Sequence, residues 1–210
     1  MPLQNRVNPD GEIVADRWRG KFMGNRGGKI HDPVTRKLTK RRWASKQWII
    51  CVTDFKQRQR MVMGNGYTEL FFVDEVSALA AGHRPCFECQ RKRAQNFCKL
   101  FAAANQLSSD RAGAIDTLLH EQRLKPAIEL GAKELRNLPN GVIIKTMKGG
   151  FFAIYNGSAL QWTGLGYKAP CSLTDEAQLV TPIATVNAIA TGFEPIWHKD
   201  ETSGQAYGTS

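Results

Sequence analysis

The middle of the chain carries apolar runs that predict β-strands. Residues 48–52 read Trp-Ile-Ile-Cys-Val, a β-branched and aromatic run typical of a buried strand. Residues 58–63 and 67–73 predict two more strands, and the Asn65-Gly66 pair between them favours a hairpin turn. The segment before residue 46 is rich in glycine and cations, and we expect it to be irregular.

Three helices are expected after these strands. Asp74 is a suitable N-cap for a short helix over 75–81, which Gly82 would end. A longer helix over 90–105 and a third that starts near residue 109 and stops before Pro126 show helical spacing of apolar residues. Their buried positions are Phe97, Leu100, Phe101 and Ala104 in the longer helix and Ile115, Leu118 and Leu119 in the third.

The last third returns to strands. Residues 142–146, 151–155 and 158–163 predict three short strands, and 182–191 a helix capped by Thr181 and ended by Gly192. Strands and helices that occur in separate runs indicate an α+β protein. We expect a small zinc-stabilised antiparallel sheet with helices, followed by a β-rich C-terminal part.

The corresponding division of the chain has four parts. We expect a basic arm and zinc region over 1–105, a helical connector over 106–135, a β-rich region with a terminal helix over 136–199, and a loose tail over 200–210.

The charge is concentrated near the N-terminus. The formal net charge is +10, and residues 17–46 hold eleven Lys and Arg against the single acid Asp32. Such a segment favours a polyanionic partner, although a solvated basic face is the alternative. The residues expected to contact phosphates are Arg17, Arg19, Arg26, Lys29, Lys40, Arg41 and Arg42. A membrane span and a secretory signal are not expected, so we expect a cytoplasmic protein.

Two of the five cysteines form a Cys-x-x-Cys pair, Cys86 and Cys89. Gly82 breaks the preceding helix and Pro85 stiffens the turn before the thiols. This spacing allows both sulfurs to bind one tetrahedral zinc ion. A redox dithiol is the alternative, but it would need a thioredoxin-like βαβ context, which the pattern does not predict.

The stretch Ser77-Ala78-Leu79-Ala80-Ala81-Gly82-His83-Arg84-Pro85-Cys86-Phe87-Glu88-Cys89 resembles the metal-binding module of Ada DNA-repair proteins and related modules of bacterial nucleases. The resemblance covers about residues 70–93. It implies two upstream ligands, and His31 and Cys51 are available for these places, with His83 and Cys98 as alternatives for the fourth ligand. Ada modules use an upstream cysteine pair for methyl transfer. This chain lacks that pair, so the methyl-transfer activity is not implied.

Two other groups of residues suggest chemistry. Asp116, His120 and Arg123 share one helix face and are candidates for acid–base catalysis, or else form a surface charge cluster. His31 and Asp32 follow a glycine-rich loop and could hold a catalytic metal, as in treble-clef nucleases.

The sequence therefore predicts a zinc-containing nucleic-acid-binding protein, with DNA a more probable partner than RNA, acting in DNA repair, modification or phage conflict. Two alternatives stay open at this point. One is a DNA-processing enzyme, either a nuclease or a base-removing glycosylase, and the other is a zinc-stabilised protein-interaction module.

Overall fold

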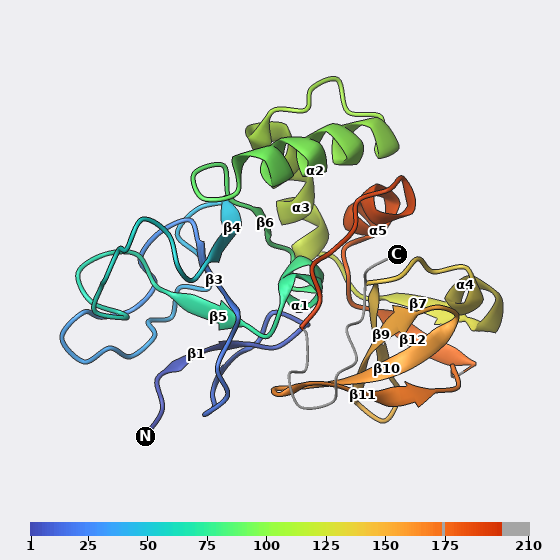
Figure 1. Cartoon of the computed structure of the whole chain (residues 1–210), viewed down its shortest axis with the longest axis horizontal. Coiled ribbons are helices and arrows are strands. Elements are labelled where there is room, and N and C mark those ends of the chain that lie inside the picture. The colour runs from blue at the N-terminus through green and yellow to red at the C-terminus, as the bar shows by residue number, and fades with distance from the viewer. Residues whose placement is uncertain (174, 199–210) are drawn as a thin grey trace.

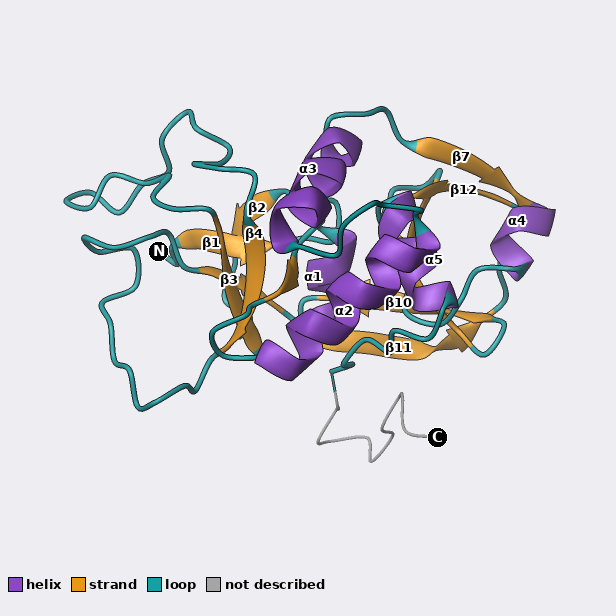
Figure 2. Cartoon of the chain, turned by 90° about the horizontal axis from the view of Figure 1, so that it is seen from above, coloured by secondary structure: helices purple, strands orange, loops and turns teal. Residues whose placement is uncertain are grey.

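The computed structural model describes residues 1–173 and 175–198. Two six-stranded sheets lie on opposite sides of the molecule, with most of the helices between them in Figure 2 and partly above them in Figure 1. The α+β class is thereby confirmed. In the described part of the chain, no helix is long and apolar enough to cross a membrane.

The first sheet has the strand order β2-β1-β5-β3-β4-β6. Its β1–β5 and β4–β6 ladders are parallel and the others antiparallel, so this sheet is mixed rather than antiparallel as expected. Its strands are β1 (Gln4–Val7), β2 (Ile13–Ala15), β3 (Phe22–Arg26), β4 (Trp48–Val52), β5 (Leu70–Phe72) and β6 (Arg84–Pro85).

The second sheet is antiparallel throughout, in the order β11-β10-β9-β8-β12-β7. Its strands are β7 (Ile128–Gly131), β8 (Ile143–Thr146), β9 (Phe151–Tyr155), β10 (Ser158–Thr163), β11 (Gly166–Cys171) and β12 (Glu176–Leu179). The edge strand β7 comes from the segment expected to be a helical connector.

The five helices are α1 (Glu75–Ala80), α2 (Arg91–Ala104), α3 (Ala112–Arg123), α4 (Ala132–Arg136) and α5 (Ile183–Ala190). Asp74 caps α1, because its carboxylate accepts the Ser77 amide at 2.8 Å. Gly82 ends this helix with a φ of +77°, a conformation that glycine adopts without strain. At α5 the N-cap is Pro182, one residue after the expected Thr181.

One hydrophobic core joins both sheets through the helices. It includes Ile50 of the first sheet, Phe97 of α2 and Ile154 of the second sheet, each at most 1% exposed. Phe97 also meets Phe193, which follows α5, edge to face at 4.9 Å. The helical layer therefore fixes the two sheets relative to each other.

Three predictions of secondary structure were wrong. The segment before residue 46 is not irregular throughout, because it supplies β1, β2 and β3. Residues 58–63 form a loop instead of a strand, and Asn65-Gly66 makes no hairpin. Met63 is fully buried within this loop, and its amide donates to the Glu69 carboxylate at 2.7 Å. The tail after residue 199 lies outside the described residues.

Candidate metal centre

Parallel pairing of β4 with β6 brings the cysteines together. Ile49 and Ile50 lie opposite Arg84 and Pro85, so Cys51 lies beside the turn that begins at Cys86. The Cys86 amide donates to the Ile50 carbonyl at 2.9 Å. The Gln90 side chain, just before α2, donates to the same carbonyl at 2.9 Å. Both ends of the Cys86–Cys89 turn are therefore tied to the strand that carries Cys51.

Glycine permits the close approach of β3 to this strand. Gly24 pairs with Ile50, and a β-carbon at Gly24 would lie 2.2 Å from the Ile49 carbonyl oxygen. A larger residue would push β4 away from its neighbour.

The sulfurs of Cys51, Cys86 and Cys89 all lie within 4.8 Å of one another. Two thiolates on one tetrahedral zinc are separated by about 3.8 Å, given Zn–S bonds of about 2.3 Å. Cys86 is buried, and Cys51 and Cys89 are partly buried. The three residues thus fit a thiolate site for a soft divalent metal such as zinc.

Hydrogen bonds favour the thiolate form of Cys86 within this cluster. The hydrogen bond from the Cys51 thiol, followed by backbone amides, lowers the pKa of Cys86 to about 5 in spite of burial. One of these amides, that of Glu88, lies 3.3 Å from the Cys86 sulfur. The same interaction with Cys86, with burial, raises the pKa of Cys51. A second and third thiolate at this distance would repel the first, and a bound cation removes that repulsion.

A small cavity of about 160 Å³ borders the three thiols. Tyr67 and the buried Glu69 line it, as do Arg58 and Glu88, which form an ion pair at 2.6 Å. Three protein thiolates leave one tetrahedral position, which a water molecule or another ligand in this cavity would complete. The sequence analysis did not identify Tyr67 or Glu69, because neither belongs to a metal-ligand spacing.

His31 does not join the cysteine cluster, contrary to the expectation. Its Nδ1 lies 2.6 Å from the Thr68 hydroxyl and its Nε2 lies 2.8 Å from the Gly64 carbonyl. Both ring nitrogens are therefore engaged in joining the loop over 27–47 to the loop over 53–69. Asp32 is exposed, and its carboxylate accepts hydrogen bonds from the amide and hydroxyl of Thr35.

The two alternative ligands also lie outside the cluster. His83 is fully buried, with ring centroids of Trp48 and Phe72 at 4.9 and 4.7 Å, and its Nδ1 lies 3.1 Å from the Ala81 carbonyl. Cys98 is buried on α2, and burial raises the pKa of its thiol to about 11.

Asp116, His120 and Arg123 lie on α3 as expected, but each contacts a different neighbour. Asp116 forms a buried bidentate ion pair with Arg84, with both N–O distances 2.8 Å. Arg123 donates to the Gly82 carbonyl, and the His120 ring meets Trp43 at 5.1 Å. These contacts hold α3 against β6 and the preceding turn, and a catalytic role for the three residues stays a prediction.

The cations expected to contact phosphates divide into two groups. Six of them are exposed, namely Arg17, Arg19, Lys29, Lys40, Arg41 and Arg42. Arg26 is only 3% exposed, since its guanidinium lies over the Trp48 ring at 4.0 Å and donates to the Gly11 carbonyl. It is therefore not part of the exposed basic surface.

Comparison with protein-family models, curated proteins and solved structures found no match to this chain. The functional argument therefore rests on the geometry of the chain itself.

Proposed function

We propose that this chain is a nucleic-acid-binding protein whose first sheet is stabilised by a zinc ion on Cys51, Cys86 and Cys89. The observation that carries the proposal is the unpaired charge of the loop over 27–47. All seven of its Lys and Arg side chains are exposed. Within the described residues, none of these seven side chains is in an ion pair.

The loop over 27–47, called the basic loop here, is attached to a neighbouring loop by hydrogen bonds. The hydrogen bonds of His31 to Thr68 and Gly64 fasten it to the loop over 53–69, and the Thr68 amide donates to the Gly28 carbonyl at 3.2 Å. Both loops project from the first sheet on the side away from the second sheet (Figures 1 and 2). The surface they form is open to a large partner such as a duplex.

The zinc ion would stabilise the basic surface indirectly, by stabilising the first sheet from which the basic loop projects. Zinc on the three thiolates would join β4, which follows the basic loop, to the turn after β6. Zinc binding supplies folding free energy to small sites of this kind. The resemblance of residues 77–89 to Ada modules supports DNA as the partner and DNA repair or modification as the context.

The test measures the affinity of the zinc-loaded full chain for labelled duplex DNA, single-stranded DNA and RNA over a range of salt concentrations. For a duplex, the slope of log K against log salt is about −0.9 per phosphate contact. The loop variant changes Lys29, Lys37, Lys40 and Arg41, which are exposed in the loop over 27–47, to glutamine. The matched control removes the same charge at exposed positions elsewhere, changing Lys99, Lys133, Lys148 and Lys168 to glutamine.

We expect duplex binding with a steep salt dependence. The loop variant should reduce the slope by about 3 to 4, and the control variant should leave it nearly unchanged. An absence of binding at low salt, or an equal loss in both variants, would refute the proposal. Tighter binding of RNA than of DNA would refute the preference for DNA.

A further inference from the structure

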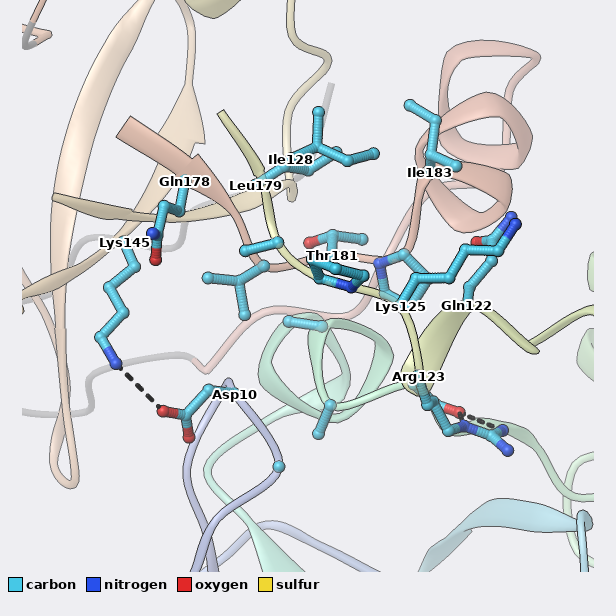
Figure 3. A pocket seen from close by; sticks show the side chains of 18 of the residues that line it. Asp10, Gln122, Arg123, Lys125, Ile128, Lys145, Gln178, Leu179, Thr181 and Ile183 are labelled. Carbon is cyan, nitrogen blue, oxygen red and sulfur yellow. Dashed lines mark hydrogen bonds and ion pairs between the residues drawn. The ribbon is translucent and has the colours of Figure 1, made fainter. Parts of the chain in front are cut away.

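A second cavity, of about 530 Å³, lies between the first sheet, the end of α3 and the second sheet. Figure 3 shows its walls coming from distant parts of the sequence, including Asp10, Arg123, Lys145 and Ile183. This volume is within the range of pockets that hold small-molecule ligands. No motif in the sequence points to it.

The charged residues that line this cavity are mostly basic. Arg26, Arg42, Arg123, Lys125 and Lys145 line it, and the one acid among its lining residues is Asp10. Asp10 is already paired with Lys145 at 3.4 Å (Figure 3). The remaining four cations have no acid among the lining residues to balance them.

Two of these cations lie against one aromatic ring, Arg26 buried and Arg123 partly buried. The guanidinium groups of Arg26 and Arg123 lie 4.0 and 4.2 Å from the Trp48 ring centroid. Arg26 is 3% exposed, and its Nε makes no hydrogen bond to the described residues. Arg123 uses its donors on the Gly82 and Lys46 carbonyls. Neither guanidinium has a carboxylate partner within the described residues.

The two arginines therefore form a destabilised cationic pair in the free protein. Burial, followed by the charges of Arg123 and Arg42, lowers the pKa of Arg26 to about 9. Burial also lowers the pKa of Arg123 to about 9, although Asp116 opposes the shift. A buried cation without a counter-charge is unfavourable, and an anion bound beside it would remove that penalty.

We propose that this cavity binds a phosphate monoester of nucleotide size. The phosphate would lie beside the guanidinium groups of Arg26 and Arg123, because guanidinium groups bind phosphate oxygens with charge-assisted hydrogen bonds. The body of the ligand would lie against Ile128, Leu179 and Ile183, which line the same cavity (Figure 3).

This site is separate from the exposed basic surface of the proposed function, with Arg42 alone common to both. The phosphate has two possible sources, a free mononucleotide or the phosphorylated 5′ end of a strand. Both sources carry the phosphate monoester group that the cavity would recognise, and the experiment below distinguishes them.

The test is isothermal titration of the zinc-loaded full chain with AMP, with adenosine, and with a dinucleotide with or without a 5′-phosphate. Lys125→Gln removes an exposed lining cation, and Arg26→Gln, checked for folding by circular dichroism, removes the buried one. Lys99→Gln, at an exposed position on α2, is the matched control.

We expect AMP to bind at least tenfold tighter than adenosine. Arg26→Gln should weaken AMP binding about tenfold, the effect of one charge-assisted hydrogen bond, and Lys99→Gln should not change it. Lys125→Gln should weaken AMP binding less than Arg26→Gln, because the Lys125 ammonium is directed away from Arg123 (Figure 3). Tighter binding of AMP than of the phosphorylated dinucleotide would assign the site to free nucleotides, and the reverse order to strand ends. Equal affinity for AMP and adenosine, or no effect of both Lys125→Gln and Arg26→Gln, would overturn the proposal.

The two proposals can fail separately. The variant with Lys29, Lys37, Lys40 and Arg41 changed to glutamine should bind AMP normally. Lys125→Gln should retain the salt-dependent binding of duplex DNA.

Discussion

The ion pair between Arg84 and Asp116 should be a main contributor to stability. Arg84 belongs to β6, two residues before Cys86, and Asp116 belongs to α3. The side chains are 1% and 9% exposed, and they meet through two hydrogen bonds of 2.8 Å. Asp116→Asn keeps the volume of the side chain but places an uncharged amide against a buried guanidinium.

The magnitude follows from this burial. Removing one partner of a buried ion pair costs about 3–5 kcal/mol, because the other charge remains in the interior. For a protein of this size, such a loss lowers the melting temperature by about 6–20 °C. Since β6 leads directly into Cys86, we also expect the variant to release zinc more easily than the unchanged chain.

The assay is urea unfolding of the zinc-loaded protein, with Asp110→Asn as a control at an exposed position before α3. The control should change the free energy of unfolding by less than about 0.5 kcal/mol. The double variant Arg84→Met with Asp116→Leu should recover much of the loss, since it leaves no buried charge unpaired. A loss below about 1 kcal/mol for Asp116→Asn would refute this reasoning and return Asp116 to the candidates for catalysis.

Two other predictions concern buried titratable groups. Burial, followed by the charges of Arg26 and Arg123, holds the pKa of His83 well below 6.5. The unfolded chain therefore gains a proton at this residue below about pH 6.5, and the folded chain does not. As the pH decreases below about 6.5, the free energy of unfolding should fall by up to about 1.4 kcal/mol per pH unit. His83→Phe should reduce the difference in urea stability between pH 7.5 and 5.5, and an unchanged difference would contradict the assignment. At pH 8, alkylation followed by mass spectrometry should label the exposed Cys171 and spare Cys98, whose pKa is raised to about 11, whereas equal labelling would contradict the burial of Cys98.

Local patterns were sufficient to predict much of the secondary structure. The strand over 48–52, the Asp74 cap and Gly82 stop of α1, and the strands β9 and β10 agree with the structure. In each case the signal lies within the element itself, as an apolar run, a capping residue or a turn glycine. Strands such as β1 and β12 have short or mixed patterns, and their stability comes from partners far along the chain.

The same distinction explains the outcome at the metal centre. The spacing of Cys86 and Cys89 indicates a shared ligand, and Cys51 joins them because β4 pairs with β6. His31 precedes Cys51 by twenty residues, an unusually wide spacing for a ligand pair, and its ring is directed to Thr68 and Gly64 by loop contacts that no local pattern encodes. The basic cavity was likewise not predictable, because Arg26 and Arg123 are far apart in sequence and meet only at Trp48.

The most direct test of the account is the metal content of the purified chain and of its cysteine variants. We predict one zinc per chain, lost or strongly weakened in Cys51→Ser, Cys86→Ser and Cys89→Ser. Cys98→Ser and His31→Gln should retain the metal, because neither side chain lies in the cluster. A chain that contains no zinc after expression with zinc, or one that holds zinc equally well with Cys51→Ser, would contradict the proposed centre.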